Sequence, residues 1–214
     1  MKLTLYELYQ MMLNQMGPTG WWPADSKNEI ICEEILIQNT NAENAERATA
    51  NLRNQTAFDG SALLCLPSAK LEDLIRPAGF FKNKGKAIHN FFAWYHQFNF
   101  KPALVSQRFG KDLRKKLLTL HGIGNETADV LLTYVFDQPA FISDKYARTL
   151  FTHLGIKGLK DYQSLARRCQ LTAEFSLADA QEFHGLIDEF GKKYLRRTDR
   201  FADSFLNQYQ LILH

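Results

Sequence analysis

Two glycines and one acidic residue form the segment of this sequence whose chemistry is clearest. Gly122 and Gly124 come directly before an apolar stretch with helical spacing that runs to Phe136. The first turn of a helix has backbone N–H groups without partners inside the helix, and the helix dipole is positive there. Such a turn binds a phosphate without a cationic side chain. Asp144 follows with a carboxylate. A phosphate-binding turn followed by a lone acid indicates chemistry on a nucleic-acid backbone or base.

The glycine pair by itself also fits simpler structures. A dinucleotide-binding fingerprint needs a preceding strand and a third glycine, and this sequence has Thr127 at the third position. The stretch 109–119 has leucines at helical spacing, so the order is helix, glycine turn, helix. A purely structural helical hairpin has the same order. The continuation of the pattern to Asp144 favours a functional role.

The hairpin is part of a longer set of motifs. It extends as Leu120-x-Gly122-Ile-Gly124-x-x-Thr127-Ala128-x-x-Leu131, followed by Asp144-x-x-x-Arg148. Three further motifs are Ile37-Gln38-Asn39-Thr40, Ile75-Arg76-Pro77-Ala78-Gly79-Phe80-Phe81-x-x-Lys84 and Phe190-Gly191-Lys192. Together they cover about residues 20–195 and resemble the helix-hairpin-helix DNA glycosylases of the endonuclease III superfamily.

That resemblance implies an all-α, two-lobed fold of the endonuclease III type. The 214 residues would form a single glycosylase unit. About 27–136 would make a central helical lobe containing the hairpin 110–136, and about 1–26 plus 137–214 the second lobe. The sequence lacks alternating runs of Val, Ile and Thr, so strands are not expected. Ser26 with Glu29 three residues later predicts a capping box.

Helical spacing predicts most of the secondary structure. The expected helices are 3–16, 27–38, 42–54, 67–75, 83–98, 110–119, 125–136, 144–154, 161–169, 177–195 and 199–213.

The resemblance assigns catalysis to Asp144. Breaking an N-glycosidic bond builds positive charge on the sugar, which a carboxylate stabilises while it orients or deprotonates a water. An Asp at a helix start is also a common N-cap, and the two roles are compatible. Family members that also cleave the DNA backbone have a nucleophilic lysine where this chain has Glu126. A carboxylate cannot form an imine, so we expect a DNA N-glycosylase without strong AP-lyase activity. Glu126 also fits a plain first-turn residue stabilised by the helix dipole.

The triplet Trp21-Trp22-Pro23 resembles the base pocket of the endonuclease III-like 3-methyladenine DNA glycosylases, and Lys192 is expected to close that pocket together with Glu126. Tryptophan faces attract cations, and N-alkylated purines are cationic. Anchoring in the core is the simpler reading of the triplet. Ala42 stands where a further aromatic residue is expected.

Two segments are expected to probe the DNA. An extruded base leaves a gap in the duplex, and Gln38 with its neighbour Asn39 would fill it while Phe80 wedges beside the opposite base. The hairpin residues Gly122, Gly124 and Thr127 complete the expected DNA contacts. Gln38 as an exposed helix end and Phe80 as a core residue are the simpler readings.

Composition sets limits on the cofactors and the location. The formal net charge of +3 permits DNA binding, and three scattered cysteines suit reduced thiols. Residues 185–214 contain no cysteine, so the iron–sulfur cluster of many relatives is not expected. The resemblance implies that backbone carbonyls of Leu118, Leu120 and Ile123 hold Na⁺ or K⁺, and no other cofactor is expected. No membrane segment or signal peptide is seen, so a cytoplasmic, nucleoid-associated bacterial monomer is expected.

The sequence therefore predicts base excision repair by a glycosylase that releases alkylated purines of the 3-methyladenine type from double-stranded DNA. A glycosylase for oxidised or deaminated pyrimidines is one alternative, although a neutral base needs specific hydrogen bonds to its edge. A non-catalytic protein that binds damaged or bent DNA is the other, and Asp144 at its spacing argues against it.

Overall fold

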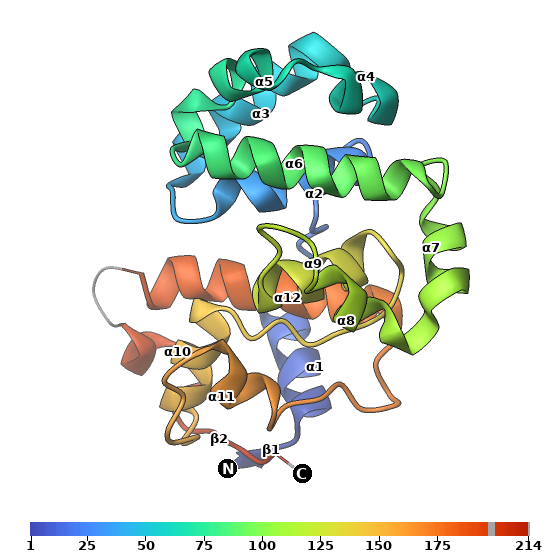
Figure 1. The fold of residues 1–214 in the computed structure, drawn as a ribbon. Coiled ribbons are helices and arrows are strands. Elements are labelled where there is room, and N and C mark those ends of the chain that lie inside the picture. The colour runs from blue at the N-terminus through green and yellow to red at the C-terminus, as the bar shows by residue number, and fades with distance from the viewer. Residues whose placement is uncertain (197–199, 214) are drawn as a thin grey trace. The chain divides into compact units, whose positions relative to one another are not determined.

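Helices form nearly all of the regular structure, which confirms the all-α prediction. The computed structural model describes residues 1–196 and 200–213 and divides into two units (Figure 1). One unit comprises Met1–Pro23 and Asp137–His214, and the other comprises Ala24–Phe136. Among the described residues, no helix has the length and apolar character needed to cross a membrane.

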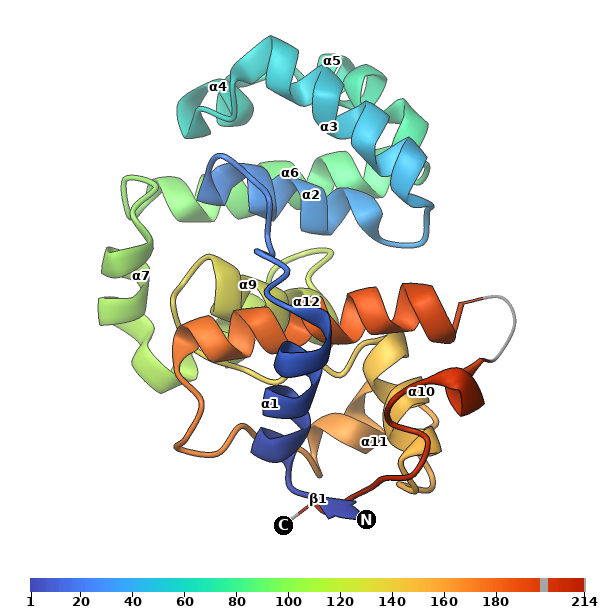
Figure 2. The same cartoon turned by 180° about the vertical axis from the view of Figure 1, so that it is seen from behind.

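The unit Ala24–Phe136 is built around the neighbouring helices α2 and α6 (Figures 1 and 2). Helix α2 also packs against α3 and α9, and the large buried side chains Phe91, Phe92 and Tyr95 come from one turn of α6. The elements of this unit are α2 (Lys27–Ile37), α3 (Ala42–Thr56), α4 (Gly60–Cys65), α5 (Ser68–Leu74), η1 (Arg76–Ala78), α6 (Phe81–His96), α7 (Pro102–Phe109), η2 (Gly110–Asp112), α8 (Leu113–Leu117) and α9 (Asn125–Tyr134).

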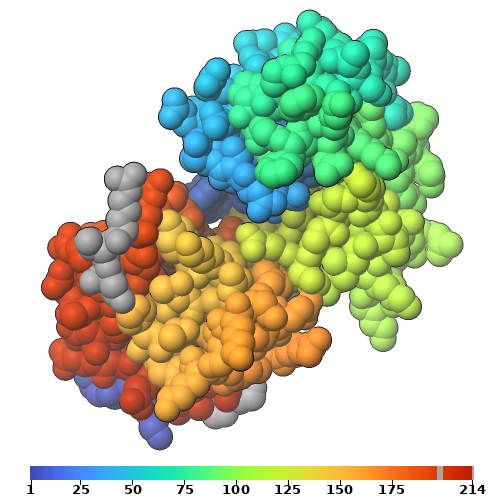
Figure 3. All heavy atoms as spheres, turned by 60° about the vertical axis from the view of Figure 1, so that its left-hand side comes forward, coloured from blue at the N-terminus to red at the C-terminus, as the bar shows by residue number. Residues whose placement is uncertain are grey.

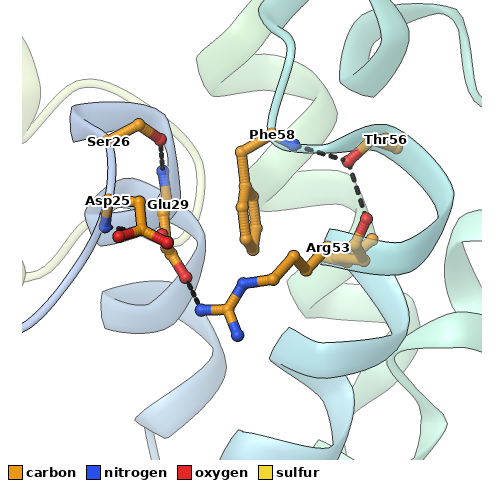
Figure 4. A network of polar contacts seen from close by, with 7 residues as sticks. Asp25, Ser26, Glu29, Arg53, Thr56 and Phe58 are labelled. Atoms are coloured by element: carbon orange, nitrogen blue, oxygen red, sulfur yellow. Dashed lines mark hydrogen bonds and ion pairs between the residues drawn. The ribbon is translucent and has the colours of Figure 1, made fainter.

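A polar network fixes the start of α2 (Figure 4). The Ser26 hydroxyl accepts the Glu29 N–H at 3.2 Å, which is half of the predicted capping box. The other half does not form, because the Glu29 carboxylate accepts the Asp25 N–H at 2.9 Å and pairs with Arg53 of α3. Glu29 is buried, so its charge needs these partners. The network holds α2 against α3.

The unit of both chain ends consists of α1 (Leu5–Met16), α10 (Lys145–His153), α11 (Tyr162–Ala166), α12 (Leu177–Tyr194), η3 (Phe201–Asp203) and two short strands. Strands β1 (Lys2–Leu3) and β2 (Gln210–Leu211) are parallel, with Leu3 opposite Leu211. Both ends of the chain therefore lie side by side (Figures 1 and 2). The core beneath them contains Leu8, Met12, Phe151, Phe183 and Phe190.

Several predicted elements differ from the structure. The prediction that strands are absent is wrong, because β1 near one end of the sequence pairs with β2 near the other. Each strand has only two residues, too few to show an alternating pattern. The helix predicted over 199–213 is also wrong. The structure has η3 and β2 in this stretch, and Asp199 lies outside the described residues. The helix predicted over 110–119 is present as η2 followed by α8, and Gly110, with a positive φ of 49°, separates η2 from the preceding α7. Helices α4 and α7 were not predicted, although Asp59 and Pro102 mark their starts.

Candidate active site

The glycine turn joins α8 to α9 as the sequence predicts. Gly122 has φ +79°, and a Cβ on it would meet the Ala87 methyl group of α6 at 2.6 Å. Both the backbone conformation and the close approach of α6 therefore require glycine. Gly124 is the N-cap of α9, and within the described residues no side chain caps this end. The exposed hairpin thus presents the start of a ten-residue helix, as a phosphate site needs.

Gln38 lies against the hairpin. It ends α2, and its side-chain amide donates to the Gly122 carbonyl at 3.2 Å and to the Thr127 hydroxyl at 3.0 Å. Thr127 is buried in α9. Its role in the site is therefore to hold Gln38, which joins the end of α2 to the turn.

Phe80 and Asn39 both have a left-handed backbone, with φ of 46° and 52°. Phe80 is 68% exposed, so it is no core residue. A cavity of about 350 Å³ is lined by both residues and by Gln38, His121 and Gly122. Figure 3 shows the surface on which the yellow-green hairpin segment adjoins the blue and green segments of the same unit. Three DNA-probing candidates and the hairpin therefore surround one hollow.

The proposed cation ligands lie in the same turn. The Leu120 carbonyl accepts the Ile123 N–H at 3.2 Å, which leaves its second lone pair for an ion, as for any carbonyl. Carbonyl oxygens of this turn, with those of Leu118 and Ile123, suit a hard monovalent cation. Among the described residues, no group of three or more His, Cys, Asp or Glu side chains is arranged to hold a metal ion.

Asp144 is the N-cap of α10. Its Oδ1 accepts the Ala147 N–H at 2.7 Å, and its backbone carbonyl accepts the Arg148 N–H. The Arg148 guanidinium donates to the Ser143 carbonyl at 2.6 Å. The preceding extended segment and the cap together fix the direction of this partly exposed carboxylate.

The tryptophan loop lies on α12. The Trp21 ring stacks on His184, with centroids 6.2 Å apart, and contacts Trp22 at 4.9 Å. A Cβ on Gly185 would overlap the Trp21 ring and the Thr19 hydroxyl, so the loop reaches the helix only because that residue is glycine. The Glu182 carboxylate accepts the Thr19 N–H at 2.5 Å. Trp21 is thus anchored, and Trp22 beside it is half-buried, with Pro23 exposed.

Lys192 lies on the same helix, 5.3 Å from the Trp21 ring centroid. Its ammonium pairs with Asp188 at 2.6 Å and with Glu189 at 2.8 Å. Burial is the largest single influence and opposes the charge on Lys192, but the hydrogen bonds and the negative charges of Asp188 and Glu189 together raise its pKa. Burial also lowers the pKa of His184 to about 4, with the nearby Lys192 charge as a second cause, so this imidazole is neutral at pH 7.

The predicted residues therefore fall into two sets. The unit Ala24–Phe136 brings together Gln38, Asn39, Phe80, Gly122, Gly124 and Thr127, with Glu126 exposed in the first turn of α9. The other unit holds Trp21, Trp22, Pro23 and Lys192 on one side of α12 and Asp144 at the start of α10.

Sequence reasoning missed the residues that support these side chains. Gly185 carried a signal, because a glycine inside a helix costs stability and usually has a packing reason. Glu182 and His184 carried none, since their partners are about 160 residues away in the chain. Lys84 was part of a motif but had no assigned role; it lines the cavity beside Phe80.

Known proteins match this chain in both sequence and fold. The model of the HhH-GPD superfamily of base excision DNA repair proteins matches residues 32–174. The chain is 34% identical over 197 residues to a provisionally named DNA repair glycosylase of Methanocaldococcus jannaschii, covering 90% of this chain and 89% of that protein.

Two solved structures are similar over almost the whole chain. The H. pylori 3-methyladenine DNA glycosylase MagIII bound to 1,N6-ethenoadenine has a TM-score of 0.70 and 26% identity, covering 89% of this chain and 98% of the other. A non-covalent endonuclease III–DNA complex has a TM-score of 0.74 and 18% identity, with 95% and 92% covered, and shows the same fold.

Proposed function

Because the chain belongs to the HhH-GPD superfamily of base excision DNA repair proteins and is a DNA glycosylase, we propose that it releases alkylated purines of the 3-methyladenine type from double-stranded DNA and leaves an abasic site. The observation that carries this proposal is the anchored pair Trp21 and Trp22, whose rings lie 4.9 Å apart. The rings are tilted by 58° and Trp21 is stacked on His184, so the half-buried Trp22 ring is the indole that a flat cationic base would stack on. The similarity to a 3-methyladenine DNA glycosylase supports the same substrate class.

The charges beside the tryptophans support a cationic base. An unpaired lysine near the pocket would repel an alkylated purine. Lys192 instead has two carboxylate partners, Asp188 and Glu189, so its positive charge is compensated. A cationic base is also a good leaving group, so stacking and charge compensation can suffice without hydrogen bonds to each edge of the base.

Asp144 acts at the sugar in this proposal. Its Oδ1 is held by the Ala147 N–H, which fixes the carboxylate before DNA binds. As the bond from the sugar to the base breaks, its electrons leave with the base and positive charge develops on the sugar. The carboxylate stabilises that charge and orients a water, whose oxygen bonds to the sugar carbon while Asp144 takes the proton.

The same proposal excludes strong AP-lyase activity. Glu126 stands at the position of the nucleophilic lysine of the bifunctional relatives, and a carboxylate cannot form a Schiff base with the sugar. Lys145 follows Asp144 and is exposed in the first turn of α10. It is the lysine to examine if a covalent adduct is found.

The hairpin and the cavity residues would bind the DNA around the lesion. The start of α9 would receive a phosphate, and the carbonyls of Leu118, Leu120 and Ile123 would hold Na⁺ or K⁺, which would add positive charge there. Gln38 and Asn39 fill the gap left by the extruded base, and Phe80 lies beside the opposite base.

A panel of duplexes with single lesions tests the proposal. It should include alkylated purines and oxidised and deaminated pyrimidines, with and without alkaline work-up, and with borohydride in a parallel set. We expect cleavage only after alkali, fastest with alkylated purines, and no trapped adduct. Faster release of a pyrimidine lesion would overturn the substrate class, and efficient trapping would overturn the monofunctional mechanism. Binding without any base release would indicate a non-catalytic protein.

Trp22→Ala gives the matched test of the pocket. It should raise the activation free energy for release of a cationic purine by roughly 1–3 kcal/mol. It should weaken binding to an abasic duplex by less. A structural role predicts equal losses on both DNAs with a lower melting temperature, and that result would remove the argument for a cationic base.

A further inference from the structure

Lys84 is a buried lysine that joins the two DNA-probing segments. It lies in the first turn of α6 and is only 4% exposed. Its ammonium donates to the Leu36 carbonyl at 2.8 Å and to the Ala78 carbonyl at 2.8 Å. Leu36 lies two residues before Gln38, and Ala78 lies two residues before Phe80. One side chain therefore links the end of α2 to the turn before α6.

Burying the Lys84 ammonium costs free energy of desolvation, so we look for a contact that an apolar side chain at this position could not make. Burial lowers the pKa of Lys84, because a desolvated ammonium is less stable than one in water. The hydrogen-bond partners of its ammonium are two backbone carbonyls, so the position of the side chain is fixed relative to both backbone segments. A methionine would fill the same space without desolvating a charge but could not hold either carbonyl.

The turn that Lys84 holds is strained. Phe80 has φ +46°, a conformation that bulky side chains seldom adopt and that persists only where neighbouring contacts fix it. The Lys84 N–H donates to the Phe80 carbonyl at 3.0 Å, while its ammonium holds Ala78 on the other side of Phe80. Lys84 therefore fixes the backbone on both sides of an aromatic ring that is mostly exposed.

The cavity beside the hairpin places Lys84 next to both DNA-probing side chains. Lys84 lines it together with Gln38 and Phe80, and Gln38 is itself held by Gly122 and Thr127. An amide that fills the gap left by the extruded base and a ring that wedges beside the opposite base must keep a fixed spacing. Cross-linking the two backbones keeps that spacing before DNA binds, so less binding energy is spent on ordering them.

We infer that Lys84 is a positioning residue for base extrusion, which sets the spacing of Gln38 and Phe80 through the Leu36 and Ala78 carbonyls. This inference rests on the proposed function, because it takes Gln38 and Phe80 as the residues that enter the DNA. Lys84 does not touch the reacting atoms. It acts only on the step in which the base leaves the stack.

The test compares Lys84→Met with Lys86→Met, an exposed lysine on the same helix. Each variant is given the alkylated purine that the wild type releases fastest, once paired in a duplex and once in an unpaired bulge, where extrusion costs little. We expect Lys84→Met to slow release from the paired duplex about 10- to 100-fold and release from the bulge about 3-fold or less. Lys86→Met should behave as the wild type on both. Equal losses of Lys84→Met on both substrates would overturn the inference.

A double variant covers the case in which Lys84→Met is less stable. If Lys84 acts through Phe80, adding Lys84→Met to Phe80→Ala should slow the paired reaction little further, at a temperature where both variants are folded. Additive losses would contradict the assigned role.

A binding measurement separates this inference from the proposed function. A duplex with 2-aminopurine opposite an abasic-site analogue reports unstacking of the opposite base without any chemistry. Wild type should raise its fluorescence, and Lys84→Met should raise it less at saturating protein. If no alkylated purine is released but this difference holds, the substrate class fails and Lys84 keeps its role. If the fluorescence rise is equal, the Lys84 inference fails alone.

Discussion

At the scale of single residues, Asp144 combines a structural and a proposed chemical role that one substitution separates. Asn is as good an N-cap as Asp, since its side-chain oxygen also accepts the Ala147 N–H. Asp144→Asn should therefore keep the fold and DNA binding, and should slow base release by about 10²- to 10⁴-fold, because the charge serves the transition state. Single-turnover release measures the effect. Near-normal turnover by this variant would refute the catalytic role.

Asp144→Ala is the control for the cap. It removes both the charge and the Ala147 hydrogen bond, so it should lower stability by about 0.5–2 kcal/mol in addition to losing activity. The melting temperature distinguishes the two variants.

His184 gives a prediction for stability against pH. Burial and then the Lys192 charge lower its folded pKa to about 4 from 6.5. The unfolded chain binds a proton there below about pH 6.5, whereas the folded protein does so only below about pH 4. Stability is therefore lost as the pH falls through this window, by about 3 kcal/mol from this group. His184→Gln should lose less over the same range in denaturant unfolding. Parallel curves for the two proteins would show that His184 is not the group responsible.

At the scale of elements, α12 positions the tryptophan loop through Gly185. A Cβ there would overlap the Trp21 ring, which is itself held against His184. Gly185→Ala should displace the loop and slow the release of cationic bases, although alanine favours the helix by about 1 kcal/mol. Gly85→Ala in α6 is the matched control, because its Cβ would have neighbours no nearer than 3.5 Å. It should be neutral or slightly stabilising. Normal base release by Gly185→Ala would show that the loop does not depend on this contact.

At the scale of the whole molecule, the environment of the cysteines predicts that the protein binds no iron–sulfur cluster. Cys32 and Cys169 are buried, and burial raises the pKa of both thiols, so neither is disposed to bind metal as a thiolate. Cys65 is exposed in the unit that contains Cys32. The purified protein should be colourless and free of thiolate–iron charge-transfer absorption. Stoichiometric iron and sulfide would contradict this prediction.

The local part of the protein was determined by the sequence itself. The hairpin, the caps at Ser26 and Asp144 and most helices follow from glycine placement, capping residues and apolar spacing, which act within a few residues. The same motifs identified the family, which the comparisons confirm. The prediction of a helix over 199–213 was wrong because Gln210 and Leu211 pair with β1 instead. No local pattern encodes a pairing partner about 200 residues away in the sequence.

The tertiary structure alone decided how the side chains are supported. Glu182 and Gly185 hold a loop from the opposite end of the sequence, and burial in the folded protein, with the Lys192 charge as a second cause, lowers the pKa of His184. The motif that contains Lys84 gave this residue no role, and only folding places two carbonyls beside its ammonium. Hydrogen bonds and desolvation depend on which groups meet in space, and these contacts join residues whose separation in the chain leaves no periodic signal.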